Sequence, residues 1–321
     1  TCIQVMTGAP VPKNSDQVIP VELVTDKGED VIFSSIGGGG THIRRAGEDI
    51  GKGQILIKRG ARIETQHMMP LAAAGIEKVN VCLRPRAVFI ATGRELVDNF
   101  SSPLGPGQIY NANRPYGVAA LAEMGVDCIA AYTILDDELE FKKILSTILD
   151  QNVDLIVSSG AVSAGVFDFV PKVLSEMGAT LHYHKVRIKP GKPNLFATFP
   201  CGAAYFGLPG NPVATAVGLR FFVAPFVRAV QGMPLEQGLI VRSETYFKKK
   251  APLQLFLKSR VSLSPAGDIT VAIMTGQESF MVHPFLDMNA WAVMPEAQDI
   301  LQVGDLVTVY PLSSNGINLT F

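Results

Sequence analysis

The sequence predicts a multidomain protein of α/β and β type, in which a three-layer α/β/α domain with a mostly parallel sheet is flanked by β-rich regions. Over residues 85–233, apolar runs such as "RAVFIATG" and "DLIVSSG" alternate with helical patterns such as "DDELEFKKILSTILDQ". This alternation is typical of βα units whose sheet is covered by helices on both faces. From residue 234 onward, short strand-like runs such as "DITVAIM" and "DLVTVYPL" predict a C-terminal β-barrel-like domain.

The N-terminal part of the chain is predicted to be β-rich. Over residues 1–53, short runs such as "QVIPVELV" and "DVIFSSI" are broken by Gly, Pro and Asp. The chain opens on "TCIQVMTGAPVP" without an initiator Met, so we expect that an N-terminal part of this domain is missing. Residues 54–84 hold a helix-like "TQHMMPLAAAG" and short strands, which are too little for a core of their own and predict a small connecting domain. The expected division is therefore 1–53, 54–84, 85–233 and 234–321.

Composition excludes several classes of protein. Of the 321 residues, 47% are hydrophobic and 18% are charged, as in a globular rather than a disordered chain. The net charge of −1 argues against a nucleic-acid binder held by a broad basic face. No apolar run approaches the ~20 residues that span a bilayer, so no membrane association is expected. The four cysteines are scattered without a CxxC pair, which argues against a zinc knuckle or a disulfide framework and favours the cytoplasm.

The apolar runs of the α/β part end in loops that are rich in small and acidic residues. In an open parallel sheet the carboxyl ends of the strands share one edge, and ligands bind in the crevice there. Loops that are far apart in the sequence can therefore converge. The candidate residues in these loops are Glu95, Asp136, Gly160, Ser163, Gly165, Asp168, Pro209, Gly210, Asn211 and Pro212.

The chemistry of these loops favours a phosphate-bearing ligand. Small residues let a ligand approach backbone N–H groups, and helix N-termini add positive dipole ends. Carboxylates beside a phosphate would repel it unless a cation lies between them, so Glu95, Asp136 and Asp168 predict a Mg²⁺ site. Each residue has a simpler interpretation that stays open: Asp136 and Asp168 could cap helices, and Glu95 could be solvated.

Two other stretches carry polar groups that could contact a ligand. "HKVRIKPGKPN" contains Lys185, Lys189 and Lys192 around a Pro-Gly turn, which either binds an anion or forms a basic hairpin tip. In "GQIYNANR", Asn113 precedes a helical pattern and is expected to act as its cap or as a ligand contact.

Taken in order, the motifs "MTGAPVP", "IRRAGEDI", "TGRELV", "GQIYNAN", "SSGAVSAGVFDF", "KPGKP" and "GLPGNPV" resemble the MoeA family of molybdopterin molybdenumtransferases, which includes the E domain of gephyrin. The resemblance covers essentially the whole chain and is strongest over 86–231. It implies a MogA-like α/β domain and an elongated homodimer of four-domain subunits. It also implies a Mg²⁺-assisted reaction, in which adenylylated molybdopterin made by a MogA-type partner is hydrolysed, molybdate is inserted, and AMP is released.

The resemblance also implies roles for individual residues. Thr7 matches a functional threonine of the family, and Glu95, Asp136 and Asp168 match its acidic cluster. The residues that match groups around the pterin phosphate, the molybdate or the pocket wall are Lys185, Lys189, Pro209, Pro212, Lys258 and Ser279.

The sequence departs from the family pattern at four positions. Arg94 and Asn111 stand where the family has Asp, and Ala161 and Glu278 stand where it has Gly. Ala has a Cβ, so a positive φ at residue 161 would carry strain. Two alternatives stay open. One is a molybdopterin adenylyltransferase, because the α/β domain is shared with MogA-type proteins, and the other is a gephyrin-like molybdopterin-binding scaffold with reduced catalysis, which the departures at Arg94 and Ala161 support.

Overall fold

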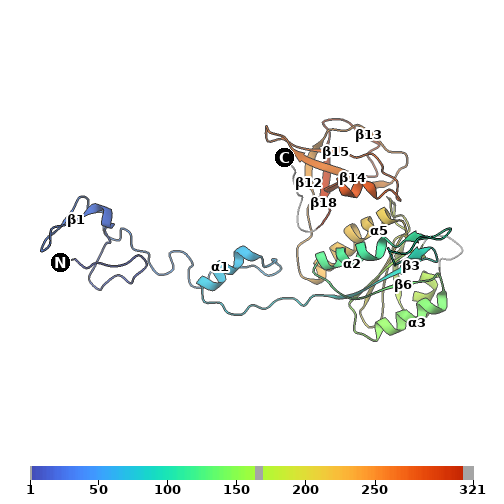
Figure 1. Cartoon of the computed structure of the whole chain (residues 1–321), viewed down its shortest axis with the longest axis horizontal. Coiled ribbons are helices and arrows are strands. Elements are labelled where there is room, and N and C mark those ends of the chain that lie inside the picture. The colour runs from blue at the N-terminus through green and yellow to red at the C-terminus, as the bar shows by residue number, and fades with distance from the viewer. Residues whose placement is uncertain (1, 163–168, 314–321) are drawn as a thin grey trace. The chain divides into compact units, whose positions relative to one another are not determined.

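The computed structural model describes residues 2–162 and 169–313 of the chain. The chain divides into two compact units, Thr1–Val79 and Asn80–Phe321 (Figure 1).

The first unit holds few regular elements. The short helix η1 (Val21–Leu23) leads into the antiparallel hairpin of β1 (Val24–Asp26) and β2 (Val31–Phe33), and helix α1 spans Thr65–Ala73. The hairpin turn is fixed by Asp26, whose Oδ1 accepts a hydrogen bond of 2.8 Å from the Gly28 amide. The remaining described residues of this unit form turns and irregular segments.

The second unit begins with a six-stranded sheet of order β6-β3-β7-β11-β10-β8. Its strands, in that order, are Asp127–Ile134, Arg86–Thr92, Leu155–Ser159, Ala204–Leu208, Leu195–Thr198 and Thr180–His184. The first four are parallel, because helices carry the chain back between them. Strand β10 pairs in antiparallel orientation with both β11 and β8, so β10 alone runs opposite to the other five. The prediction of a mostly parallel sheet is therefore confirmed.

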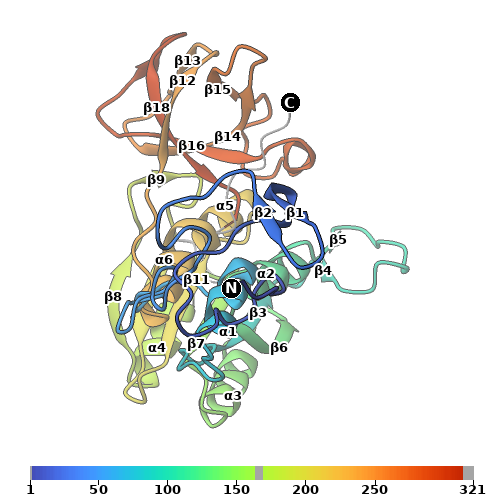
Figure 2. The ribbon, with the colours of Figure 1, turned by 90° about the vertical axis from the view of Figure 1, so that its left-hand side faces the viewer.

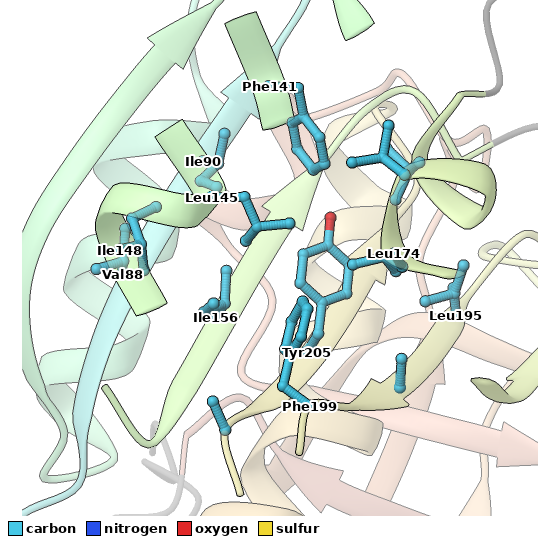
Figure 3. Packing of buried hydrophobic residues seen from close by; sticks show 14 of the residues in the cluster. Val88, Ile90, Phe141, Leu145, Ile148, Ile156, Leu174, Leu195, Phe199 and Tyr205 are labelled. Atoms are coloured by element: carbon cyan, nitrogen blue, oxygen red, sulfur yellow. The ribbon is translucent and has the colours of Figure 1, made fainter. Parts of the chain in front are cut away.

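Helices cover both faces of this sheet. Helices α3 (Glu138–Leu149) and α4 (Val170–Glu176) pack on one face, where Phe141 and Leu145 contact the core around Ile156 (Figure 3). The opposite face is covered by α2 (Asn113–Glu123), α5 (Pro212–Gly218), η2 (Leu219–Val223) and α6 (Ala224–Val230). Residues of β3 alternate between the two cores, as a strand buried on both faces requires.

The segment Pro212–Val230 is one helical run with a π-helical turn, η2, in its middle. Pro225 has no amide to donate one turn back, which interrupts the regular ladder at this point. By length and composition the run could cross a membrane, so the expectation that no apolar run approaches this length is wrong. Its most apolar window is 61% buried inside the protein, and residues such as Val217 and Val223 belong to the two cores that it joins.

The C-terminal part of the second unit is a closed barrel. Strands β15-β12-β18-β16-β14 are neighbours in this order, and pairing between β14 and β15 closes the ring (Figure 2). Their ranges are Ile269–Ile273, Leu239–Ser243, Leu306–Pro311, Ala290–Met294 and Gln254–Leu263. The predicted barrel-like domain is confirmed. A two-stranded ribbon of β13 (Phe247–Lys248) and β17 (Ile300–Leu301) accompanies it.

The barrel packs against α5. Strand β9 (Ile188–Lys189), which follows the α/β strand β8 in the chain, adds to the barrel strand β14 in parallel. Val213 and Val217 of α5 pack with Trp291 of the barrel strand β16 in one apolar cluster. This contact brings barrel loops to the first turn of α5.

Candidate functional site

The four parallel strands end in register at one edge of the sheet. Thr92 of β3 pairs with Ile134 of β6, and Ser159 of β7 pairs with Leu208 of β11. The loops that follow these strands therefore start side by side, as the sequence predicted.

Glu95 and Asp136 follow neighbouring strands at this edge. The Gly93 amide donates a hydrogen bond of 3.1 Å to the Ile134 carbonyl, which ties the two loops together. The Glu95 carboxylate folds over Gly93, since a Cβ at residue 93 would lie 2.8 Å from either carboxylate oxygen. Glu95 is exposed and Asp136 is half-buried. Both carboxylates can therefore offer oxygen atoms to a cation bound at this edge of the sheet.

Asp136 is not the cap of α3. The cap is Asp137, whose Oδ1 accepts a hydrogen bond of 2.8 Å from the Glu140 amide. The cap interpretation of Asp136 is therefore wrong.

The third predicted acid, Asp168, lies outside the described residues, together with Ser163 and Gly165. Among the residues that are described, no group of three or more His, Cys, Asp or Glu side chains could hold a metal ion.

Gly160, directly after β7, allows two loops to approach closely. Its φ is +99°, and a Cβ there would lie 2.4 Å from Thr92 Oγ1 and 2.5 Å from the Thr92 carbonyl oxygen. Its amide donates to the Leu208 carbonyl at 2.9 Å, and its Cα lies beside Gly210. A glycine at residue 160 is thus required by backbone packing.

Beside Gly160 lies Ser159, a group that sequence reasoning missed. Its hydroxyl is buried and has no hydrogen-bond partner among the described residues. The sequence "SSG" does not distinguish Ser159 from Ser158, whose hydroxyl forms a hydrogen bond with the Tyr205 hydroxyl.

The Pro209–Pro212 loop between β11 and α5 is held from two sides. Thr215 Oγ1 donates to the Pro209 carbonyl at 2.6 Å, and the buried Asn113 donates from Nδ2 to the Gly210 carbonyl at 2.7 Å. Asn113 is therefore not the cap of α2; the Oδ1 of Asn111 accepts from the Arg114 amide instead. Gly210 and Asn211 remain exposed.

Asn111 is fully buried in a polar network next to this edge. Its Nδ2 donates to Asp98 Oδ1 at 3.0 Å and to Thr133 Oγ1 at 2.9 Å, and Asp98 also pairs with Arg114 at 2.5 Å. An aspartate at residue 111 would set two carboxylates against each other, whereas the amide donates to Asp98. The network fixes the ribbon of β4 (Leu96–Val97) and β5 (Ile109–Tyr110), which follows Glu95.

The predicted basic turn lies against α5. The Lys185 amide donates to the Asn194 carbonyl and the Val186 amide to the Lys192 carbonyl, both at 2.8 Å, so the segment forms a hairpin. Lys185, Lys189 and Lys192 are all exposed, and Gly191 packs near the Ala214 carbonyl of α5. The hairpin interpretation is confirmed, and the Pro-Gly turn of the hairpin lies near the helix that follows the Pro209–Pro212 loop.

The barrel contributes Ser279 to the same helix start. Its carbonyl accepts a hydrogen bond of 3.1 Å from the Val213 amide in the first turn of α5. Lys258 is completely buried, and its Nζ donates to the carbonyls of Glu278 at 3.1 Å and Met281 at 2.8 Å. Burial lowers the pKa of Lys258, while the nearby Glu278 acts in the opposite direction.

Thr7 belongs to the first unit. It is exposed in a turn closed by the Ala9 amide and the Met6 carbonyl at 3.0 Å, with Gly8 at φ +80°. Its role stays a prediction.

Comparison with known proteins gives the family. Three family models match: the MoeA N-terminal region (domain I and II) over residues 1–75, a probable molybdopterin binding domain over 88–229, and the MoeA C-terminal region (domain IV) over 241–312. A molybdopterin molybdenumtransferase of Synechococcus elongatus is 35% identical over 309 residues, which are 96% of this chain and 75% of that protein. The chain belongs to the MoeA family of molybdopterin molybdenumtransferases.

Other MoeA-family proteins agree with this. The molybdopterin molybdenumtransferase of Haemophilus influenzae is 32% identical over 320 residues, covering 98% of this chain and 78% of that protein. A crystal structure of a molybdopterin biosynthesis MoeA protein from Pyrococcus horikoshii has a TM-score of 0.76 at 28% identity, over 95% of this chain and 74% of that one.

As a MoeA-family chain, this protein accommodates its departures from the family pattern in different ways. Asn111 is satisfied by Asp98, and Ala161 adopts φ +50°, the positive value that sequence reasoning flagged as strained. Arg94 is exposed next to Glu95, and Glu278 is exposed while its carbonyl holds Lys258.

Proposed function

We propose that this chain is a molybdenum insertase, which takes adenylylated molybdopterin and molybdate and yields molybdenum cofactor and AMP. The observation that carries the proposal is the convergence at the sheet edge and the start of α5. Glu95 and Asp136 follow neighbouring strands, and the Pro209–Pro212 loop, the lysine hairpin and Ser279 meet at one helix start. Family membership supports the same reaction.

The substrate carries negative charge at both reacting parts. The exposed Lys185, Lys189 and Lys192 can bind molybdate or the pterin phosphate through charge-assisted hydrogen bonds. The exposed backbone of Gly210 and Asn211 lets the anhydride approach closely. Water then attacks one phosphorus of the anhydride, and the bond from that phosphorus to the bridging oxygen breaks. AMP and the molybdopterin phosphate separate, one with the bridging oxygen and the other with the oxygen of the water. Positioning and charge stabilisation account for most of the rate in such a step.

Mg²⁺ suits the acids of this edge. Glu95 and Asp136 supply carboxylate oxygens, the donors that Mg²⁺ prefers, and the motif adds Asp168 from the next loop. These three residues would hold the ion, which neutralises phosphate charge when bound. The exposed Arg94 adds a positive charge next to Glu95 and weakens this site relative to a chain with an acid there.

The wider setting of the enzyme belongs to the same proposal. We infer a cytoplasmic homodimer that receives its substrate from a MogA-type adenylyltransferase. We also retain the division into 1–53, 54–84, 85–233 and 234–321. The ranges of the family models, 1–75, 88–229 and 241–312, agree with the boundaries near residues 85 and 234, and the boundary at residue 53 rests on the sequence pattern alone.

The test is AMP release by the purified protein with adenylylated molybdopterin, molybdate and Mg²⁺. We expect release by the parent chain, loss of release with a chelator, and loss in Asp168→Ala at unchanged substrate binding. Binding of molybdopterin without AMP release by the parent would favour the scaffold alternative. Unchanged release in Asp168→Ala would remove Asp168 from the mechanism.

A further inference from the structure

Lys258, in barrel strand β14, is a cation that solvent does not reach. Its side chain is fully buried, and its ammonium donates to the carbonyls of Glu278 and Met281 at 3.1 and 2.8 Å. The backbone around it is held as well, since Gln277 donates from Nε2 to the Lys258 carbonyl at 2.8 Å and accepts from the Lys258 amide at 3.0 Å. A buried ammonium is costly unless its donors are used, so these bonds fix its position.

The carbonyls that Lys258 holds belong to the loop that contacts α5. Ser279 lies between the two held residues, and its carbonyl accepts from the Val213 amide at 3.1 Å. Val213 follows Pro212, which has no amide, so this bond satisfies the first free N–H of the helix. The loop is also packed tightly, because a Cβ on Gly276 would lie 3.2 Å from Pro284 and 3.3 Å from Met281 Sδ.

A lysine that binds an anionic substrate must show its ammonium to that substrate. Lys185, Lys189 and Lys192 are exposed and can do so, whereas Lys258 donates to the loop carbonyls and has no exposed surface. In this arrangement the ammonium of Lys258 is not open to a substrate, and its contacts lead to the loop that meets α5.

We propose that Lys258 is a positioning residue, which holds the 277–281 loop so that Ser279 fixes the start of α5 and, with it, the Pro209–Pro212 loop of the site. The part of this proposal that concerns the substrate rests on the proposed function. The part that concerns the loop does not.

The experiment compares Lys258→Met with Lys249→Met in the full chain. Lys249 is a matched control because it is also a buried lysine of the C-terminal domain. Its Nζ donates to the Pro295 and Glu296 carbonyls at another turn and lies 3.5 Å from Asp299 Oδ1. The first readout is hydrogen exchange of the Val213 amide. We expect Lys258→Met to accelerate it about tenfold or more, and Lys249→Met to leave it unchanged even if the melting temperature falls in both.

The second readout separates positioning from direct binding. A misplaced loop should raise KM for molybdate and lower kcat together, since loop displacement disturbs both binding and orientation. Gln277→Ala, which leaves the ammonium in place, should move Val213 exchange and both constants in the same direction by a smaller amount.

Two results would overturn the proposal. A higher KM with unchanged Val213 exchange would make Lys258 a direct ligand, and unchanged exchange and kinetics with only a lower melting temperature would make it purely structural. Failure of the parent chain to release AMP would contradict the proposed function but not the role of Lys258 in the loop, because hydrogen exchange of the Val213 amide is measured without substrate.

Discussion

Two adjacent residues at the end of β7 show how one Cβ decides what a position tolerates. Gly160 and Ala161 both have positive φ, +99° and +50°. At residue 160 a Cβ would overlap Thr92, whereas Ala161 keeps its methyl group, which packs on the core beneath. Ala161 is therefore strained but accommodated, and Gly160 cannot be replaced without moving the loop that carries the site.

Ala161→Gly should leave the free energy of unfolding unchanged or slightly higher. Relief of the left-handed backbone, worth about 1 kcal/mol, offsets the entropy that glycine adds to the unfolded chain. Ala119→Gly, at an exposed position of α2, has no strain to relieve and should cost about 1 kcal/mol. Urea denaturation of both variants measures the difference; equal losses would contradict the assignment of strain to Ala161.

At the scale of elements, the helical run Pro212–Val230 joins the α/β domain to the barrel. Arg220 in its π-helical turn donates from Nη2 to both carboxylate oxygens of Glu236 at 2.7 Å and from Nε to the Pro311 carbonyl at 2.9 Å. Its guanidinium also lies 5.8 Å from the ring centre of Tyr310. The turn thus holds the last barrel strand against the helix that begins at the site.

Glu236→Ala should destabilise the protein by roughly 2–3 kcal/mol, because it leaves the buried Arg220 guanidinium without its anion. The control is Glu176→Ala, which removes exposed ion pairs with Lys142 and Lys172 and should leave stability nearly unchanged. Thermal unfolding measures both. Similar shifts for the two variants would mean that the Arg220 contact does not hold the barrel.

At the scale of the whole molecule, the sequence predicts the architecture better than it predicts individual side-chain roles. Apolar strands that alternate with helices predict a parallel sheet with helices on both faces. In such a sheet the carboxyl ends of the parallel strands lie at one edge. The roles of Asp136 and Asp137 could not be separated from the sequence. Both aspartates directly precede the helical pattern, and helix boundaries read from sequence are uncertain by more than one residue. The burial of Lys258 could not be seen, because its partners lie twenty or more residues away in the chain.

The measurement that most directly tests the account is a Mg²⁺ titration of AMP release by Asp136→Ala and Asp137→Ala. We predict that Asp136→Ala raises the Mg²⁺ concentration at half-maximal rate about tenfold or more at an unchanged melting temperature. Asp137→Ala removes the α3 cap, so it should cost about 1 kcal/mol of stability and leave the Mg²⁺ dependence as in the parent. The same Mg²⁺ dependence in both variants would contradict the claim that the loop acids of this sheet edge hold the ion.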